Sequence, residues 1–207
     1  MQTHDTPEKT YDLERLIFFT DGVFAIVITL LVIDLRPPAG WDRTFAGLLR
    51  AEWRSLLAYG FSFVAVGAYW NAHRTLFRRI ARFHPILVLL NLALLGLVVL
   101  IPFASELIFE TGPRGEPFVI YLGLVAAIGA AQALLWGCAA FLANVVDAGV
   151  SARDRWIILG ALITVPALVF LGGLGVASGS TTAMAWLVPV ALAIGILRRR
   201  LLARKPA

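Results

Sequence analysis

The chain has 207 residues, of which 59% are hydrophobic and only 15% are charged, and its mean hydropathy is +0.82. This composition excludes an ordinary soluble globular protein and indicates an integral membrane protein. The net charge of +5 does not predict a nucleic-acid partner, because the arginines lie beside long apolar runs, where membrane topology accounts for them.

Long apolar segments predict an all-α integral membrane protein, because a helix needs about 20 residues to cross a hydrocarbon core of about 30 Å. Six segments meet or approach this length and predict six transmembrane helices in a single transmembrane domain over residues 1–207. They are residues 14–35, 53–77, 84–109, 117–146, 156–177 and 182–198. The Gly- and Ser-rich stretch GGLGVASGSTT at 172–182 predicts a short turn between the last two. A five-span arrangement with a re-entrant segment at this stretch is the alternative.

The basic residues predict the orientation of these spans. Thirteen Lys and Arg residues fall on the side that would hold both termini and the second and fourth loops, against five on the other side. Both termini are therefore expected in the cytoplasm, with the protein in the cell membrane as a multi-pass protein. The acidic N-terminal segment lacks a basic n-region, so a cleaved signal peptide is not expected.

The first predicted span contains an Asp-Gly pair, Asp21-Gly22, which in a soluble protein indicates a turn. A helix that began at Gly22 and ended at Leu35 would span only about 21 Å, too short for the bilayer. We therefore expect the helix to begin near Thr10 to Leu13, with Thr10 as its N-cap. Asp21 then lies about two turns inside the helix, where its carboxylate needs a hydrogen-bond donor. Donors at matching depth lie in the second and third spans: Trp70, Asn71, His73, Arg74 and Asn91.

A second feature of this helix is a stripe whose deep part carries no charge, on a face that Asp21 does not share. At 100° per residue, the stripe contains Arg15, Phe19, Gly22, Ile26, Thr29 or Leu30, and Ile33. Two interpretations are open. The stripe packs against another span of the same chain, or copies of it meet around a central axis and line a pore.

The stretch RLIFFTDGVFAIVITLLVIDL resembles the first helix of the transmembrane protein 175 family of potassium channels. The family signature is Arg-x-x-x-Phe-Ser-Asp with Phe-Ala two residues further on. The corresponding residues of this chain are Arg15, Phe19, Thr20, Asp21, Phe24 and Ala25. YWNAH (69–73) and NLALLGLVVLIPF (91–103) are similar to parts of the second and third helices of the family. The resemblance is distinctive over about the first 110 residues.

The resemblance implies a role for each matched position. The first helix would line the pore, with a hydrophobic constriction at Ile26 and further pore-facing positions at Gly22, Thr29, Leu30 and Ile33. A structural polar network would brace this helix without binding the ion, through Arg15, Thr20, Asp21, Trp70, His73 and Asn91. Thr20 departs from the family serine, and its extra methyl group adds bulk beside a hydroxyl with the same hydrogen-bonding capacity.

The resemblance also implies an assembly. Animal members carry two copies of the unit, whereas this chain carries the motif once. One pore-lining helix cannot enclose a channel, so a homotetramer in the lipid bilayer is implied, as in bacterial members.

The resulting hypothesis is a potassium-selective, voltage-insensitive cation channel. Monovalent cations pass through it, and it needs no cofactor. The filter sequence TVGYG is absent, as is an Arg-rich span of voltage-sensor type. The alternative is a proton-coupled secondary transporter that uses Asp21 and His73. No enzyme is expected, because no nucleophile–base pair or phosphate-binding loop is found, and no metal site is expected, because His73 and His84 lack a ligand partner.

Overall fold

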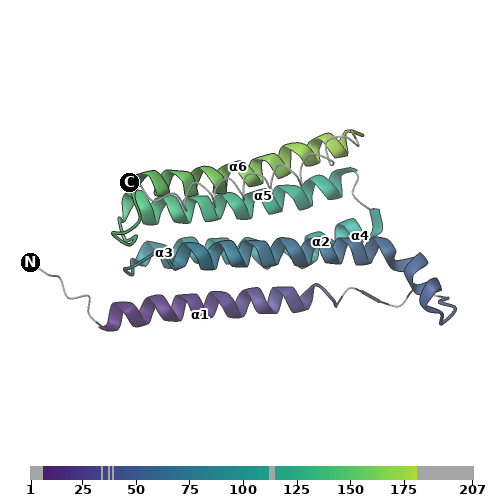
Figure 1. The fold of residues 1–207 in the computed structure, drawn as a ribbon. Helices are drawn as coiled ribbons and strands as arrows, with labels where there is room; N and C mark the ends of the chain where they lie inside the picture. The colour runs from purple at the N-terminus through teal and green to yellow at the C-terminus, as the bar shows by residue number, and fades with distance from the viewer. Residues whose placement is uncertain (1–6, 34, 37, 39, 112–114, 181–207) are drawn as a thin grey trace, which may run out of the picture.

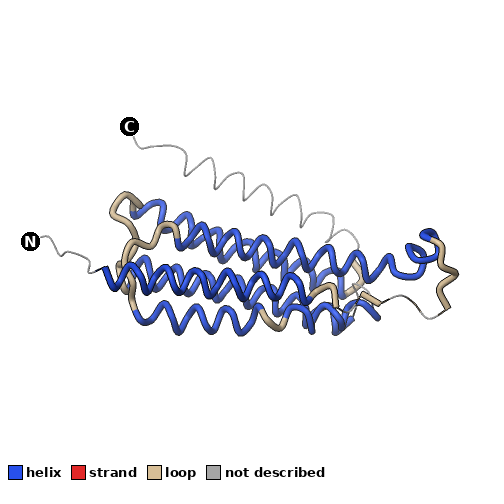
Figure 2. The backbone as a smooth tube through the Cα atoms, turned by 90° about the horizontal axis from the view of Figure 1, so that it is seen from below, coloured by secondary structure: helices blue, strands red, loops and turns tan. Residues whose placement is uncertain are grey.

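The computed structural model describes residues 7–33, 35–36, 38, 40–111 and 115–180. In this part of the chain the secondary structure is helical, apart from an isolated bridge between Ile80 and Val146. The helices are α1 (Pro7–Leu30), α2 (Phe45–Phe77), α3 (Pro85–Val98), α4 (Ile101–Thr111), α5 (Gly115–Gly137), the π-helix η1 (Cys138–Leu142) and α6 (Ala152–Ala177). They lie side by side along one long axis (Figure 1), and the loops gather at the two ends of the bundle (Figure 2).

The expectation of six membrane spans in each subunit is wrong. Within the described residues, three helical segments are long and apolar enough to cross a membrane: Pro85–Phe109, Gly115–Leu142 and Ala152–Gly175. Helix α1 falls short because Glu14, Arg15 and Asp21 interrupt its 24 residues. The hydropathy of helix α2 is lowered by charged residues in its first half and by polar aromatic and amide side chains in its second half. The predicted span 182–198 lies outside the described residues, as does the end of the predicted 172–182 turn, whose first six residues are helical in α6.

The first helix begins earlier and ends earlier than predicted. It starts at Pro7, where the fixed φ of proline suits a first helical turn, so Thr10 is inside the helix and is not its N-cap. It ends at Leu30, and residues 31–33 form a turn. Asp21 and Gly22 both lie within the continuous helix, which excludes the turn interpretation of this pair.

Helix α2 begins eight residues before the predicted span because a local cap starts it. Thr44 Oγ1 accepts a hydrogen bond from Gly47 N at 2.9 Å, and Asp42 Oδ1 accepts from Thr44 N at 2.9 Å. The backbone hydrogen bond from Thr44 is the main reason that the pKa of Asp42 lies below its usual value. With 33 residues, α2 is about 50 Å long, and its first turns project beyond the other helices (Figure 1).

The third predicted span is broken in two. Helix α3 ends at Val98 and α4 starts at Ile101, with Pro102 in its first turn. Proline has no N–H, and its ring would clash with the carbonyl four residues earlier, which is that of Val98. A continuous helix over 84–109 is therefore interrupted at Val99–Leu100.

The arrangement of the helices leaves α1 at one edge of the molecule. Figure 1 shows α1 along one side, α2 with α3 and α4 next to it, and then α5 and α6. Helix α5 packs on α2, α3, α4 and α6, whereas α1 packs on α2, α3 and α4. Helix α1 consequently has neighbours on one of its faces only within the described part of the chain.

Candidate pore helix and its anchoring network

The face of α1 that points away from the bundle is apolar and exposed. On the helix, Ile26 is 59% exposed and Leu30 is 39% exposed, and Ile33, in the turn that follows, is 60% exposed. Gly22 and Thr29 are exposed as well. The structure therefore places all five predicted pore positions on one uncovered face.

The opposite face of α1 is buried against the other helices. Its buried residues follow helical spacing and are Leu16, Thr20, Phe24, Val27 and Leu31. Phe24, Val27 and Leu31 join a core cluster with α2, α3, α4 and α5. No described helix of the same chain covers the stripe, so the interpretation that another span packs against it finds no support among the described residues.

Thr29 is the polar residue among the five predicted pore positions. Its Oγ1 donates to Ile26 O at 2.8 Å, within the same helix. Because the hydroxyl proton is used on the backbone, the oxygen offers only its two lone pairs, which act as acceptors. Thr29 is therefore equipped to accept or to solvate a positive charge rather than to donate to an anion.

A buried chain of hydrogen bonds fixes the other face of α1. Thr20 Oγ1 donates to Leu16 O at 2.7 Å and accepts from Asn91 Nδ2 of α3 at 2.7 Å. Asn91 Oδ1 lies 2.8 Å from His73 Nε2 of α2. The proton of the Thr20 hydroxyl is already used, so the amide group must donate to Thr20 and turn its oxygen to His73. His73 Nε2 therefore carries a proton and donates it to Asn91 Oδ1.

The ring of His73 is enclosed as well as hydrogen-bonded. It stacks on Phe77 with ring centroids 4.2 Å apart, and the Phe24 ring of α1 lies at 6.1 Å. Thr20, Asn91 and His73 are 0%, 0% and 2% exposed, so water cannot substitute for a missing partner.

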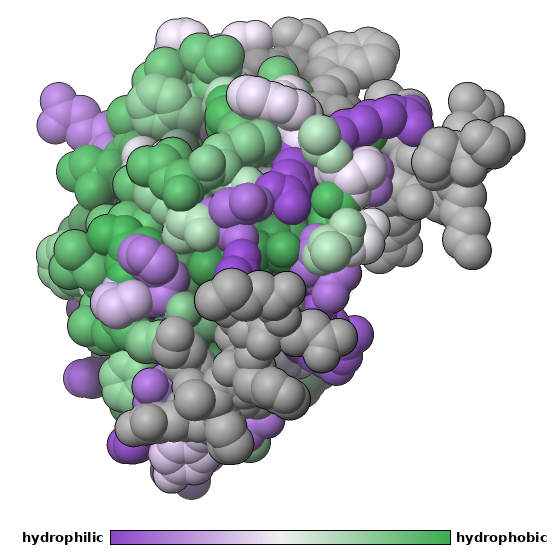
Figure 3. Space-filling model, turned by 90° about the vertical axis from the view of Figure 1, so that its left-hand side faces the viewer, coloured by the Kyte–Doolittle hydropathy of each residue, from purple (hydrophilic) through white to green (hydrophobic). Residues whose placement is uncertain are grey.

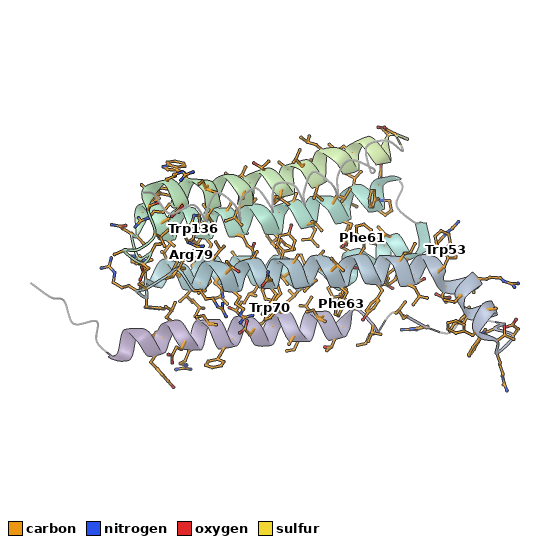
Figure 4. The ribbon with its side chains drawn as sticks, viewed as in Figure 1. Trp53, Phe61, Phe63, Trp70, Arg79 and Trp136 are labelled. Atoms are coloured by element: carbon orange, nitrogen blue, oxygen red, sulfur yellow. The ribbon has the colours of Figure 1, made fainter. Side chains whose placement is uncertain are left out.

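Asp21 is held separately, by the second helix. Trp70 Nε1 donates to Asp21 Oδ1 at 2.8 Å, and Figure 4 shows Trp70 between α2 and α1. Arg15 lies outside this network: it is exposed, and its guanidinium group lies 5.6 Å from the centre of the Tyr11 ring. Arg74 lies over the ring of Trp70 at 5.5 Å. Five of the six predicted residues thus form hydrogen bonds, in two separate groups: Thr20, Asn91 and His73 form one, and Asp21 and Trp70 form the other. Their role in bracing a pore helix stays a prediction.

Two further polar contacts connect α5 to its neighbours. Ser62 Oγ of α2 lies 2.6 Å from Ser105 Oγ of α4 and 3.0 Å from Tyr121 OH of α5. Gln132 Nε2 of α5 donates to Tyr69 O at 2.8 Å. Isolated hydroxyl groups in apolar helices show no characteristic spacing, so the sequence could not show that Ser62, Ser105 and Tyr121 meet. Within the described ranges, no group of three or more His, Cys, Asp or Glu residues could hold a metal ion.

Comparison with known proteins identifies the family. The model of the family described as "Endosomal/lysosomal potassium channel TMEM175" matches residues 15–102. A potassium channel of Chamaesiphon minutus is 34% identical over 142 residues, which are 66% of this chain and 70% of that protein. The chain belongs to the TMEM175 family. The predicted resemblance is therefore confirmed, and so is the expectation that the protein is not an enzyme, since the family is one of ion channels.

Two further matches agree with TMEM175 membership. A potassium channel of Chryseobacterium sp. (strain P1-3) is 37% identical over 119 residues, which cover 54% of this chain but only 57% of that protein. The crystal structure of a lysosomal potassium-selective channel TMEM175 homolog from Chamaesiphon minutus matches with a TM-score of 0.65 and 27% identity, covering 91% of this chain and 98% of that one. The chain is thus a helical membrane protein with the fold of that homolog.

Proposed function

We propose that this protein is a potassium-selective, voltage-insensitive cation channel, built as a homotetramer with α1 of each copy lining the pore. The observation that carries the proposal is an exposed apolar stripe opposite the buried residues of α1, with Ile26 59% exposed on the helix and Ile33 60% exposed in the turn that follows it. An exposed stripe on a helix fixed by a buried polar network is suited to face copies of itself. The names of the bacterial relatives as potassium channels support the same function.

The proposed constriction is a ring of Ile26 side chains. A narrow ring of branched aliphatic side chains bars ions by dewetting, and a slightly wider ring admits water and a partly dehydrated ion. Potassium loses its hydration shell more easily than sodium, so an apolar constriction favours potassium. One turn beyond, the Thr29 oxygens form a second ring that compensates the ion for lost hydration.

A homotetramer follows from the single pore helix. One copy of α1 in each chain cannot enclose a pathway, and the exposed face contains no other described helix to complete it. Voltage insensitivity is supported by the positions of the arginines, which lie near helix ends rather than in a repeated series within a span. We place the channel in the cell membrane with both termini in the cytoplasm, because the basic residues predict this orientation.

The transporter alternative has no contact in its favour. Asp21 and His73, the residues it would couple, bind Trp70 and Asn91 respectively, and no hydrogen bond joins the two.

Replacing Ile26 with Asn tests the pore face directly. A polar ring wets the constriction, so the basal potassium current of the purified protein in planar bilayers should rise. Ile163→Asn is the matched control. Ile163 is 54% exposed, as Ile26 is 59% exposed, but it lies on α6 and not on the proposed pore helix. An unchanged current in Ile26→Asn, or an equal rise in the control, would show that α1 does not line the pore.

Replacing Thr29 with Val tests the second ring. Valine keeps the shape and removes the hydroxyl, so the reversal potential under potassium and sodium gradients should shift toward lower potassium selectivity. Thr164→Val is the matched control, since Thr164 Oγ1 also donates back to its own helix, to Gly160 O at 2.7 Å. Unchanged reversal potentials in Thr29→Val would remove this ring from the mechanism while leaving the Ile26 test untouched.

A further inference from the structure

Two loops at one end of the bundle are tied into a single surface. The loop after α2 and the loop after η1 exchange backbone hydrogen bonds: Ala81 N donates to Val145 O at 2.9 Å, and Asp147 N donates to Arg79 O at 2.8 Å. Figure 4 shows Arg79 at this end of the bundle. Four helix ends, those of α2, α3, η1 and α6, therefore hold this surface in place.

Arginine side chains are fixed within this surface. Arg82 Nη2 donates to Asn144 O at 2.6 Å, and Arg155 Nη1 donates to Asn144 Oδ1 at 2.8 Å and to Ala140 O at 2.7 Å. Two guanidinium groups thus converge on one residue, Asn144, which adopts a left-handed conformation with φ of 49°. Both are satisfied by neutral oxygens, so their charges are not neutralised by the bonds that position them.

The surface carries a large excess of positive charge. Residues 74–84 and 143–155 contain six arginines and two aspartates. Arg78, Arg82 and Arg153 are exposed, and in the part of the chain that the structure describes none of them forms an ion pair with a carboxylate. At the opposite end, residues 34–54 and 106–116 contain five arginines and six acidic residues, so the excess belongs to one end only.

Exposed apolar side chains border the same surface. Leu142 is 80% exposed and Trp156 is 64% exposed, and the rings of Phe141 and Trp156 lie 4.6 Å apart. Each of the three described segments able to cross a membrane has one end here, at Pro85, Leu142 and Ala152. Figure 3, which faces this end, shows hydrophilic side chains beside a broad hydrophobic area. Basic residues at the same end of the bundle as an exposed tryptophan match the boundary between lipid headgroups and acyl chains.

We propose that this surface, formed by the 78–84 and 143–155 loops, is a binding site for the headgroups of anionic phospholipids. The phosphate of the headgroup binds between Arg78, Arg82 and Arg153, while the first part of an acyl chain lies against Trp156 and Leu142. Guanidinium groups suit this partner because they bind phosphate oxygens in pairs. The site depends on the charge and position of the loops and not on conduction through α1.

The test uses the full chain purified in detergent and native mass spectrometry with equal amounts of phosphatidylglycerol and phosphatidylcholine. The wild type should retain phosphatidylglycerol preferentially. Arg78→Gln combined with Arg153→Gln should reduce this preference by roughly fivefold for each arginine removed. The side-chain hydrogen bonds that tie the described loops come from Arg82 and Arg155, and a melting curve with the wild-type midpoint shows that the fold is kept. Arg78→Lys with Arg153→Lys keeps the charge and should retain most of the preference.

The matched control removes two arginines at the opposite end. Arg50→Gln with Arg54→Gln takes the same charge from exposed positions of α2 and should leave the preference unchanged. The proposal is overturned if the Arg78 and Arg153 double variant binds both lipids as the wild type does. It is also overturned if the control loses as much, which would indicate net charge alone, or if inorganic phosphate displaces the lipid, which would indicate a simple anion site.

Discussion

Replacing Asn91 with Leu is the sharpest perturbation of the structure, because this one amide group joins three helices. Asn91 Nδ2 donates to Thr20 of α1, and Asn91 Oδ1 accepts from His73 of α2, at 2.7 and 2.8 Å. Leucine has a similar volume and adds no large cavity, so the effect reports the lost hydrogen bonds.

The expected cost follows from what each partner keeps. Thr20 Oγ1 still donates to Leu16 O, so it loses only an acceptor role. His73 Nε2 loses its partner while only 2% exposed, and a buried donor left without a partner costs about 1–3 kcal/mol. Interhelical hydrogen bonds in membrane proteins are worth about 0.6 kcal/mol on average and about 1.7 at most. We expect a loss of about 2 kcal/mol in the free energy of unfolding.

The assay is reversible unfolding of the purified protein in detergent micelles, with a double-mutant cycle. His73→Phe removes the orphaned donor and keeps a ring against Phe77, so Asn91→Leu should cost about 1 kcal/mol less in that background than in the wild type. Asn71→Leu is the matched control on an exposed position of α2 and should stay within about 0.5 kcal/mol of the wild type. A loss below that limit in Asn91→Leu, or full additivity with His73→Phe, would refute the buried-network reasoning.

Two further substitutions test the contacts on either side of α2 and α5. Trp70→Phe removes the donor that Asp21 uses and keeps the ring, so stability measured by the same unfolding assay should fall by about 1–2 kcal/mol; no change would mean that water serves the carboxylate equally well. Gly129→Ala would bring a Cβ into the ring of Pro166 on α6, which predicts a loss of about 1–3 kcal/mol. Gly160→Ala, where an added Cβ meets no atom within 4 Å, should be neutral or stabilising by the same measurement, and equal losses in both would contradict the close approach of α5 and α6.

The sequence predicted the exposed stripe and the need for an Asp21 partner, although not the ends of α1. Helical periodicity placed Ile26, Leu30 and Ile33 on one face, and the cost of an unpaired carboxylate in an apolar helix required a donor for Asp21. Trp70, one of the expected donors, makes this contact at 2.8 Å. These predictions needed only the spacing within one helix and one strong energetic constraint.

Features that depend on several helices together could not be predicted in this way. Arg15 falls on the same helix as the network, but a long flexible side chain finds a nearby ring, here Tyr11, at little cost. Helix length alone overestimates the number of membrane-crossing segments. The helices α1 and α2 are long enough, but their charged and polar residues lower their hydropathy. The break before Pro102 was not predicted, although the sequence contains its signal: a proline inside a helix leaves the carbonyl four residues earlier without its hydrogen bond.

The Asp21-Gly22 pair shows how neighbouring residues of one helix serve opposite faces. Asp21 is partly buried and tied to α2, whereas Gly22 is exposed, and a Cβ added there would meet no atom within 4 Å. Packing inside the subunit therefore gives no reason for a glycine at this position, in contrast to Gly129, where Pro166 leaves no room. In the proposed tetramer the reason lies between subunits: four copies of Gly22, one turn before the Ile26 ring, keep the approach to the constriction wide. A bulky residue at Gly22 should then reduce the current without changing the stability of the single subunit.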